Sequence, residues 1–413
     1  MQNGGPLSDA ELVSRLQIYE KHGISEGSKL LGISGEALRR STLSAKSRGL
    51  KSTSPIVDET AQLKLRLRAV ERELANVHRE NLSIAMLRKE LFGLSEVTPK
   101  APAWSTQAPP SKKDSTFSVP VTIWSDWHWG EIVRKSEVGG VNEFNRKIAK
   151  DRLKRLVGST IDLARHHMGV IRYPGIVIAL GGDMISGLIH EDLRETNDGT
   201  VQQTLIELQD ELVGALTVMA DQFGKVFVPC VIGNHGRMKM KPHAKHRSFE
   251  SFEWNLYQQL ERYFAKDPRF TFMIPDGPDV RFDVLGHRFM LTHGDALGTK
   301  GGDGMIGAIG PITRGAIKIG RSEAQIGRDF DTLVIGHWHS YMPRSEASGV
   351  ICNGTLKGYD EFAHTILRVP YSRASQALWF VHAKYGITAQ WQVFLDEQRA
   401  AAKTEDWVRF NRV

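Results

Sequence analysis

Apolar runs alternate with amphipathic helical stretches between residues 118 and 395. The short apolar runs predict strands at 117–125, 176–181, 225–232, 289–292 and 332–335, with further β segments near 349–355, 365–369 and 377–394. The spacing of apolar positions elsewhere predicts helices at 143–168, 201–222 and 248–265. This alternation is typical of an α/β domain, and we expect two sheets flanked by helices.

The first fifty residues have helical spacing and no predicted strands. Three short helices are expected, around residues 12–19, 24–31 and 36–46. Between the last two, Gly32 suits a positive φ and Ser34 suits a helix N-cap. A tight turn between two helices is therefore predicted.

This arrangement resembles a helix-turn-helix, in which the helix after the turn lies in the DNA major groove. Arg39, Arg40 and Lys46 lie on that helix and would meet phosphates and base edges. DNA is therefore an expected partner. The alternative is an ordinary three-helix bundle that binds protein.

Residues 60–93 carry a heptad repeat of apolar positions that runs from Leu63 to Leu91 and includes Asn81. A stripe at this spacing is buried against another helix, and an Asn in it costs stability but fixes the register. Self-association through 60–93 is expected, with the number of chains left open. The alternative is a helix that folds back onto the α/β domain.

Composition marks the remaining boundaries. Residues 95–117 contain four prolines and little apolar material, which indicates a linker. We predict five parts: a helix-turn-helix-like domain at 1–55, a coiled-coil helix at 56–94, a Pro-rich linker at 95–117, the α/β domain at 118–395 and a C-terminal tail at 396–413.

The chain has 413 residues and a net charge of +7, and residues 1–117 hold 18 Lys and Arg against 13 Asp and Glu. This excess favours polyanionic partners such as nucleic acid. No uninterrupted apolar run reaches the roughly 18 residues of a spanning helix, and the first residues lack a secretory pattern. Cys230 and Cys352 lie far apart in apolar segments and are expected to be buried free thiols. A cytoplasmic protein without a membrane partner is therefore expected.

Acids, an amide and imidazoles follow five of the predicted strands, where open α/β sheets place their ligand sites. They are Asp126 and His128, Asp183, Asn234 and His235, His293, and finally His337 and His339. Oxygen and imidazole ligands suit Mn²⁺, Fe or Zn²⁺. Two such ions about 3.5–4 Å apart can share a carboxylate and lower the pKa of a bridging water. We expect two divalent ions, with manganese as the leading candidate and iron or zinc as alternatives.

The ordered motifs resemble those of the calcineurin-like metallophosphoesterase superfamily over about residues 118–345. They are Asp126-x-His128, Gly182-Asp183, Gly233-Asn234-His235, His293 and Gly336-His337-x-His339. The resemblance implies a β-sandwich flanked by helices and metal-dependent hydrolysis of phosphate esters. It implies one metal ion held by Asp126, His128, Asp183 and His339, and a second held by Asp183, Asn234, His293 and His337. His235 would stabilise the transition state or protonate the leaving oxygen.

One position departs from the family pattern. Members usually have an acid directly after the Asn-His pair, where it can orient the histidine, and this chain has Gly236. Either another carboxylate, for which Asp295 is a candidate, orients His235, or the imidazole is held by other means. Arg237 could clamp a phosphate oxygen with its fork of donors.

Local features favour a nucleic-acid substrate. The first motif, Ser-Asp-Trp-His-Trp-Gly-Glu at residues 125–131, is similar to the Asp-x-His-x-Gly motif of repair-type exonucleases in the superfamily. Residues 237–247, which include Arg237, Lys239 and Lys241, hold five Lys and Arg and no acid, and could follow a polynucleotide backbone. A solvated surface loop is the alternative for this segment.

A DNA-directed nuclease is the leading hypothesis. One alternative is a phosphatase, or a phosphodiesterase for small molecules or cyclic nucleotides. Another is a DNA-binding regulator with an idle catalytic domain. An ATPase partner would suit a repair nuclease, although no motif indicates one, and the combination of parts is typical of bacterial or phage DNA metabolism.

Nine glycines fall between residues 294 and 320, and Gly302, Gly304 and Gly307 match a dinucleotide-binding fingerprint by letter. The match lacks the strand before it and the βαβ context, so a flexible loop beside the site is expected instead. His190 with Glu191, and the tryptophans on either side of His128, are expected to pack or face solvent, with substrate contact as the alternative.

Overall fold

The computed structural model describes residues 7–52, 100–107, 117–169, 171–298, 309–344 and 349–396. The chain divides into two compact units, Met1–Val97 and Thr98–Val413. The expected coiled coil, most of the linker, and nearly all of the C-terminal tail lie outside the described residues. The predicted boundaries next to these segments stay predictions.

The described part of the first unit consists of two helices, α1 (Asp9–Leu31) and α2 (Gly35–Ser47). The backbone of α1 is non-helical at Gly23, with φ 70° and ψ −175°, so its two segments correspond to the first two predicted helices. Gly32 ends α1 with φ 60°, and the Ser34 side chain accepts a backbone N–H of the first turn of α2. The predicted turn is confirmed.

The two helices pack through a small apolar core. Leu12 and Leu16 of α1 and Ala45 of α2 form its buried cluster. Leu38 is fully buried against α1, where a Cβ at Gly27 would lie 3.2 Å from its Cδ2. The glycine therefore lets the helices approach closely.

The second unit contains a six-stranded sheet with the order β11-β10-β1-β2-β3-β4. Its strands are β1 (Ser118–Trp124), β2 (Ile176–Leu180), β3 (Val226–Pro229), β4 (Phe270–Met273), β10 (Ser375–His382) and β11 (Gly386–Phe394). β1 to β4 pair in parallel, and β10 and β11 are antiparallel additions at one side. β1, β2 and β3 are buried along their whole length because both sheet faces are covered there, whereas β4 at the edge is only partly buried.

A second sheet of five strands has the order β5-β6-β7-β9-β8. Its strands are β5 (Asp279–Val284), β6 (His287–Thr292), β7 (Thr332–Ile335), β8 (Met342–Arg344) and β9 (Gly349–Cys352). β6, β7 and β9 pair in parallel, and the two outer strands are antiparallel to their neighbours.

The two sheets pack face to face over one apolar core. Alternate residues of β1, such as Val121 and Ile123, meet Phe282, Phe289 and Val334 from the second sheet. The remaining helices of this unit are α4 (Ala103–Thr106), α5 (Arg146–Asp162), η1 (Leu163–His167), α6 (Glu191–Thr196), α7 (Val201–Phe223), α8 (Phe252–Tyr263), η2 (Asp295–Leu297), α9 (Ile309–Gln325) and η3 (Phe362–Leu367).

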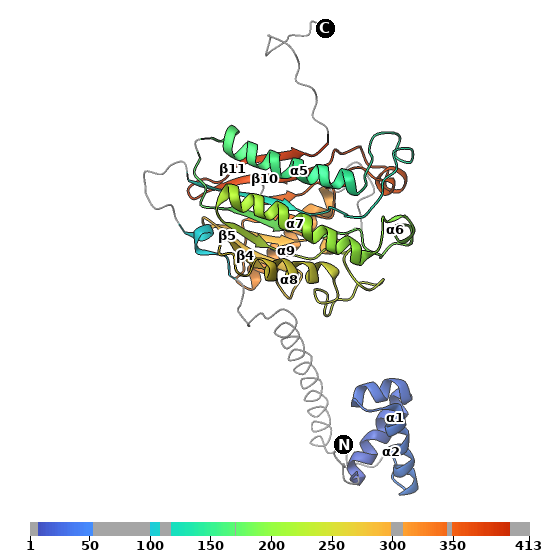
Figure 1. Ribbon diagram of the computed structural model, residues 1–413. Coiled ribbons are helices and arrows are strands. Elements are labelled where there is room, and N and C mark those ends of the chain that lie inside the picture. The colour runs from blue at the N-terminus through green and yellow to red at the C-terminus, as the bar shows by residue number, and fades with distance from the viewer. Residues whose placement is uncertain are drawn as a thin grey trace, which may run out of the picture. The chain divides into compact units, whose positions relative to one another are not determined.

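Helices cover the outer faces of both sheets. α5, α7 and α8 lie side by side along the six-stranded sheet (Figure 1), and α9 packs through Ile312 and Ala316 against the other face of β6, β7 and β9. The expected α/β architecture, two sheets flanked by helices, is confirmed.

Two local predictions are wrong. The second half of the glycine-rich stretch 294–320 is not a loop, because α9 begins at Ile309 and places Ile312, Ala316 and Ile319 on one buried side. This 3.6-residue spacing outweighs the glycine content. Residues 365–369 do not form a strand, because Asp360 accepts the N–H groups of Ala363 and His364 and starts the helical turn of η3.

The sequence analysis also missed β4, β5 and β8, whose residues are partly exposed or alternate between buried and exposed and so form no continuous apolar run. Cys230 and Cys352 are buried and free, as predicted. Within the described ranges, the helices are either too short or too polar to cross a membrane.

Candidate metal centre

The expected ligands are carried by the carboxyl ends of strands from both sheets. Asp126 and His128 follow β1, Asp183 follows β2 and Asn234 follows β3 in the first sheet, while His293 follows β6 and His337 and His339 follow β7 in the second. Parallel pairing aligns β1 with β2 and β6 with β7 up to these ends. One end of the sandwich therefore brings the side chains together.

The backbone at these positions is strained. Non-glycine residues seldom adopt positive φ, yet five of the eight described residues that do are expected ligands. They are Asp126 (57°), His128 (47°), Asp183 (50°), His337 (67°) and His339 (51°). Strain of this kind persists where the surrounding structure enforces it, and it clusters at functional sites.

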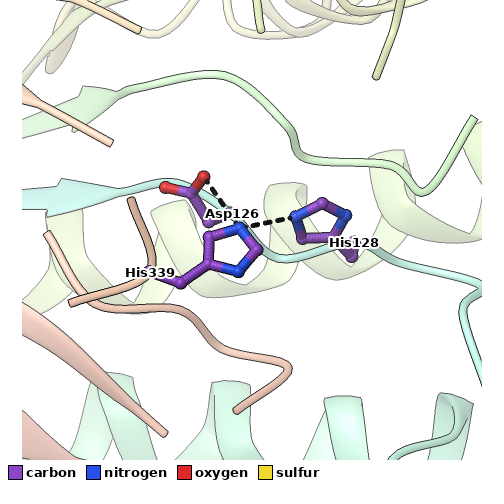
Figure 2. A group of neighbouring side chains, drawn as sticks. All are labelled: Asp126, His128 and His339. Atoms are coloured by element: carbon purple, nitrogen blue, oxygen red, sulfur yellow. Dashed lines mark hydrogen bonds and ion pairs between the residues drawn. The ribbon is translucent and has the colours of Figure 1, made fainter. Parts of the chain in front are cut away.

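Asp126, His128 and His339 form the first group (Figure 2). The His128 and His339 Nε2 atoms are 3.0 Å apart, and His339 Nε2 is 3.4 Å from Asp126 Oδ1. Figure 2 shows the two rings pointing toward one another from different segments of the chain, with the carboxylate beside them. Asp126 and His128 are buried, and His339 is partly exposed.

Asp183, His293 and His337 form the second group. His293 Nε2 lies 3.0 Å from Asp183 Oδ2 and 3.2 Å from Asn234 Oδ1. The opposite ring nitrogen, His293 Nδ1, donates to the Gly181 carbonyl oxygen at 2.8 Å. This bond directs Nε2 toward the acid and the amide.

Asp183 lies close to residues of both groups. It also groups with His128 and His235, with one donor atom of each lying within 4.8 Å of the others. Because His128 belongs to the first group and His293 to the second, the carboxylate lies between them. It is buried and in position to bridge two cations.

Glycines make room for the two carboxylates. A Cβ at Gly233 would collide with Asp183 Oδ1, and a Cβ at Gly336 would collide with Asp126 Oδ2. Neither glycine has a positive φ, whereas Gly182 has φ 84°. Gly182 therefore allows a sharp turn of the backbone, and the other two glycines provide space for the carboxylates.

The donor set fits divalent cations. In the first group, two imidazole nitrogens 3.0 Å apart and a nearby carboxylate oxygen converge on one position, as the ligands of a cation do.

In the second group, His293 and Asp183 are electrostatically paired. Burial by itself would lower the pKa of His293, but Asp183 raises it to about 10. Burial by itself would raise the pKa of Asp183, but His293 helps to hold it well below its usual range. A proton or a cation stabilises this pair, and the oxygen and nitrogen donors suit Mn²⁺, Fe or Zn²⁺.

A buried ion-pair cluster lies behind His128. Glu131 Oε2 is 3.4 Å from His128 Nδ1, and Glu131 Oε1 accepts from the Lys357 ammonium at 2.8 Å. Lys357 also contacts Asp360 at 2.5 Å, and the three side chains of this cluster are at most 8% exposed. Within the described residues His128 Nδ1 makes no hydrogen bond, and burial, followed by the nearby Lys357, holds the pKa of His128 well below its usual value.

A polar network holds the first ligand loop. The Ser125 hydroxyl donates to Asp126 Oδ2 and accepts from Asn353 Nδ2 at 2.8 Å. Gln376 Oε1 accepts from the Ser125 N–H at 3.0 Å, and the Thr355 hydroxyl donates to the Asp126 carbonyl oxygen at 2.7 Å. The segment after β9 and strand β10 therefore fixes Asp126 from behind.

His235 is oriented by a backbone carbonyl. Its Nδ1 lies 2.8 Å from the Ser186 carbonyl oxygen, while both carboxylate oxygens of Asp295 accept from Arg247 Nη2 at 2.7 Å. Asp295 is therefore not the orienting group. Burial lowers the pKa of His235 to about 4.

Two of the basic side chains after Asn234, which were expected to contact substrate, form hydrogen bonds or ion pairs within the protein. The Arg237 guanidinium donates to the carbonyl oxygens of Asn234, Lys239 and Met240 at 2.9–3.2 Å, and so holds the loop. The Lys239 ammonium pairs with Glu250. Lys241 is exposed and lines a pocket together with Arg237 and Arg247.

The other expected contact residues lie at the surface. Arg39, Arg40 and Lys46 are exposed on α2, and Arg40 lies 3.3 Å from Glu36. Trp127 and Trp129 are fully buried, as expected, and the exposed His190 has its ring centroid 5.3 Å from that of His235.

Sequence reasoning missed the residues behind the ligands: Glu131, Ser125, Glu253, Asn353, Lys357, Asp360 and Gln376. Ser125 directly precedes Asp126 and Glu131 follows His128 by three residues, so the sequence offered a local signal for these two. The other five come from distant segments, and their position depends on the fold.

No family model matches the chain, and no curated protein matches it. Solved structures match with low scores. Vacuolar protein sorting 29 from Cryptosporidium parvum has 11% identity and a TM-score of 0.29, and the match covers 67% of this chain and 99% of that one. A predicted phosphoesterase from Streptococcus pneumoniae has 9% identity and a TM-score of 0.26, with 67% and 98% covered. A dimetal phosphatase from Danio rerio has 10% identity and a TM-score of 0.33, with 68% and 100% covered. Values this low assign no function to the chain.

Proposed function

We propose that the chain is a two-metal phosphoesterase of the calcineurin-like metallophosphoesterase superfamily. The observation that carries the proposal is the position of Asp183, a buried carboxylate between two groups of ligand-type side chains. Asp126, His128 and His339 would hold one ion, and Asn234, His293 and His337 the other, with Asp183 shared.

The ions, when bound, would polarise the phosphate and lower the pKa of an attacking water. The residues of the chain supply the remaining functions. Asp183 and Asp126 offset the charge of the cations, and the Glu131 carboxylate lies behind His128. His235 sits beside both groups with its Nδ1 bonded to Ser186, which leaves Nε2 for the phosphate or the leaving oxygen. A bound phosphate would favour the protonated form of this imidazole, because opposite charges stabilise each other.

DNA is the substrate that we propose first, which makes the chain a nuclease. The exposed Lys241 next to the centre and the cationic side chains of α2 support it, because a nucleic-acid backbone is recognised by such charges. The net charge of +7 also favours a polyanionic substrate. Manganese is the proposed metal.

A phosphatase or a small-molecule phosphodiesterase is the second candidate. The pairing of Arg237 and Lys239 within the loop favours it, because these donors are occupied by carbonyl oxygens and by Glu250. A loop bonded in this way leaves fewer cations for a long polyanion. A DNA-binding regulator with an idle catalytic domain is less favoured, because the ligand set is complete.

The proposed context is a reducing cytoplasm, which the two buried free thiols support. Self-association through 60–93 is proposed from the heptad pattern alone. An ATPase partner has no support beyond its suitability for a repair nuclease.

The test is Mn²⁺-dependent hydrolysis by the purified chain, comparing single- and double-stranded DNA with mono- and bis-p-nitrophenyl phosphate. Asp183→Ala is the control variant. Cleavage of DNA that Asp183→Ala abolishes would support a nuclease. Turnover of the small esters alone would favour the second candidate, and inactivity on all four substrates would contradict both.

A further inference from the structure

Glu253 is a buried carboxylate at the start of α8, directly behind two ligand loops. It is 0% exposed. Its Oε1 accepts the N–H of Met184 at 2.6 Å, and its Oε2 accepts the N–H of Gly233 at 2.6 Å. Met184 follows Asp183 and Gly233 precedes Asn234, so one carboxylate holds the backbone beside two of the proposed ligands.

The side chain of Glu253 also fills the space above Gly236. A Cβ built on Gly236 would lie 2.6 Å from Glu253 Cγ and 2.8 Å from Cδ, closer than real Cβ contacts. Gly236 is not in the left-handed region, so its backbone does not require glycine. The side chain of Glu253, with Ser251 Oγ 3.0 Å from the same point, leaves no room for a side chain at position 236.

The start of α8 is joined to this segment by backbone bonds. The Phe252 N–H donates to the Gly236 carbonyl oxygen at 2.8 Å, and Arg237 pairs with Ser251 in an isolated bridge. The Ser251 side chain accepts the Glu253 N–H at 3.2 Å and caps the helix. Residues 236 and 253 are therefore neighbours whose relative position is fixed.

We propose that Glu253 is a positioning residue of the metal centre, whose side chain reaches from α8 into the space beside Gly236, where the family pattern has an acid. It would hold the loops of Asp183 and Asn234 at the spacing that two cations require. The inference rests on the proposed metal centre, but not on the identity of the substrate.

The physical reason is that the two backbone N–H groups are buried donors with one shared acceptor. Without the carboxylate, the N–H groups of Met184 and Gly233 would be buried without their acceptor. The two loops would then move apart to reach other acceptors. Loss of an outer hydrogen-bond partner typically lowers metal affinity by about 10- to 100-fold. The same range is expected for Glu253→Gln, whose amide NH₂ would face a backbone N–H.

The first experiment titrates Mn²⁺ into EDTA-treated wild type, Glu253→Gln and Glu261→Gln by isothermal titration calorimetry. Glu261 is a partly exposed glutamate on the same helix and serves as the matched control. We expect about 10- to 100-fold weaker binding for Glu253→Gln and unchanged binding for Glu261→Gln. Far-UV circular dichroism and the Tm of the metal-free proteins separate loss of the site from loss of the fold.

A second experiment moves the carboxylate. Gly236→Asp alone should be destabilised by the clash with Glu253, and Glu253→Ala alone should bind Mn²⁺ weakly. The double variant Gly236→Asp/Glu253→Ala should bind more tightly than Glu253→Ala, because an acid at 236 can reach the vacated position. A merely structural role of Glu253 would give no such rescue of metal affinity.

The outcomes are distinguishable. Wild-type affinity in Glu253→Gln, or a double variant that binds no better than Glu253→Ala, would overturn the role of Glu253 and leave the metal centre intact. A wild-type protein that binds no Mn²⁺ would overturn the metal centre and this inference together.

Discussion

His128 and His339 face each other with their Nε2 atoms 3.0 Å apart, although they are separated by 211 residues in the chain. Two neutral imidazoles in this geometry can share one hydrogen bond at most, and Asp126 Oδ1 is 3.4 Å from the same His339 nitrogen. A cation between the three groups would satisfy them all.

The first prediction concerns the number of ions bound. Wild type should bind two Mn²⁺ per chain, and His339→Ala should bind one tightly, because the group around His293 keeps its ligands. Equilibrium dialysis followed by atomic emission spectroscopy measures the ratio. His166→Ala, an exposed histidine on η1, should keep two ions. Two tightly bound ions in His339→Ala would contradict the proposed assignment.

The second prediction concerns Lys357, whose ammonium is buried between Glu131 and Asp360. Lys357→Met should lower the free energy of unfolding by about 3–5 kcal/mol, because it leaves two buried carboxylates without their cation. Lys150→Met removes a partly exposed lysine that pairs with Glu207, and should cost about 1 kcal/mol or less. Urea denaturation measures both. Equal losses in the two variants would argue against a special role of the buried cluster.

The third prediction is a pH dependence. Burial by itself would raise the pKa of Asp360, but Lys357 lowers it from 3.8 to about 2. A depressed acid pKa contributes stability that is present above the unfolded value and lost as the pH falls through the folded value. The contribution is about 2 kcal/mol, since one pKa unit corresponds to about 1.4 kcal/mol.

Asp360→Asn removes this titration. Its deficit in free energy of unfolding relative to wild type should be constant from pH 7 to 5 and shrink between about pH 4 and pH 2. Urea unfolding at each pH measures the difference. A deficit that stays constant down to pH 2 would show that Asp360 does not titrate in this window.

The sequence predicted that the proposed ligands follow strands, because each comes directly after an apolar run that is buried within a sheet. It could not predict that Asp183 lies between the two groups, since that depends on how the ends of β1, β2 and β6 meet. The positive φ at Asp126 and His337 was equally hidden, because only the surrounding structure enforces it. Helix α9 was missed because glycine content was weighted above the spacing of Ile312, Ala316 and Ile319.

The fourth prediction tests DNA binding by the loop after β3. Lys241→Ala should weaken DNA binding and reduce the slope of log affinity against log salt by about 0.9 for duplex DNA, if the lysine contacts one phosphate. Arg237→Ala should act differently, by disordering a loop that its guanidinium holds. Lys225→Ala, which changes an exposed lysine just before β3, at the end remote from the site, is the control. Fluorescence anisotropy at several salt concentrations measures the slope, and identical slopes for Lys241→Ala and wild type would remove Lys241 from the interface.

The last prediction concerns the helical unit at the N-terminus. Arg39 is exposed on α2, and the buried face of that helix is anchored by Leu38 and Ala45. Arg39→Ala should therefore leave the helices folded, as helix content by circular dichroism would confirm, and weaken DNA binding by the intact chain. Arg48→Ala provides the comparison, because Arg48 pairs with Asp9 at 2.8 Å in an exposed contact worth about 1 kcal/mol or less. If α2 contacts DNA, Arg39→Ala should lower the DNA affinity without changing the Tm. Arg48→Ala should at most lower the Tm slightly. Unchanged affinity in Arg39→Ala and in the matching Lys46→Ala would favour a bundle that binds protein over one that binds DNA.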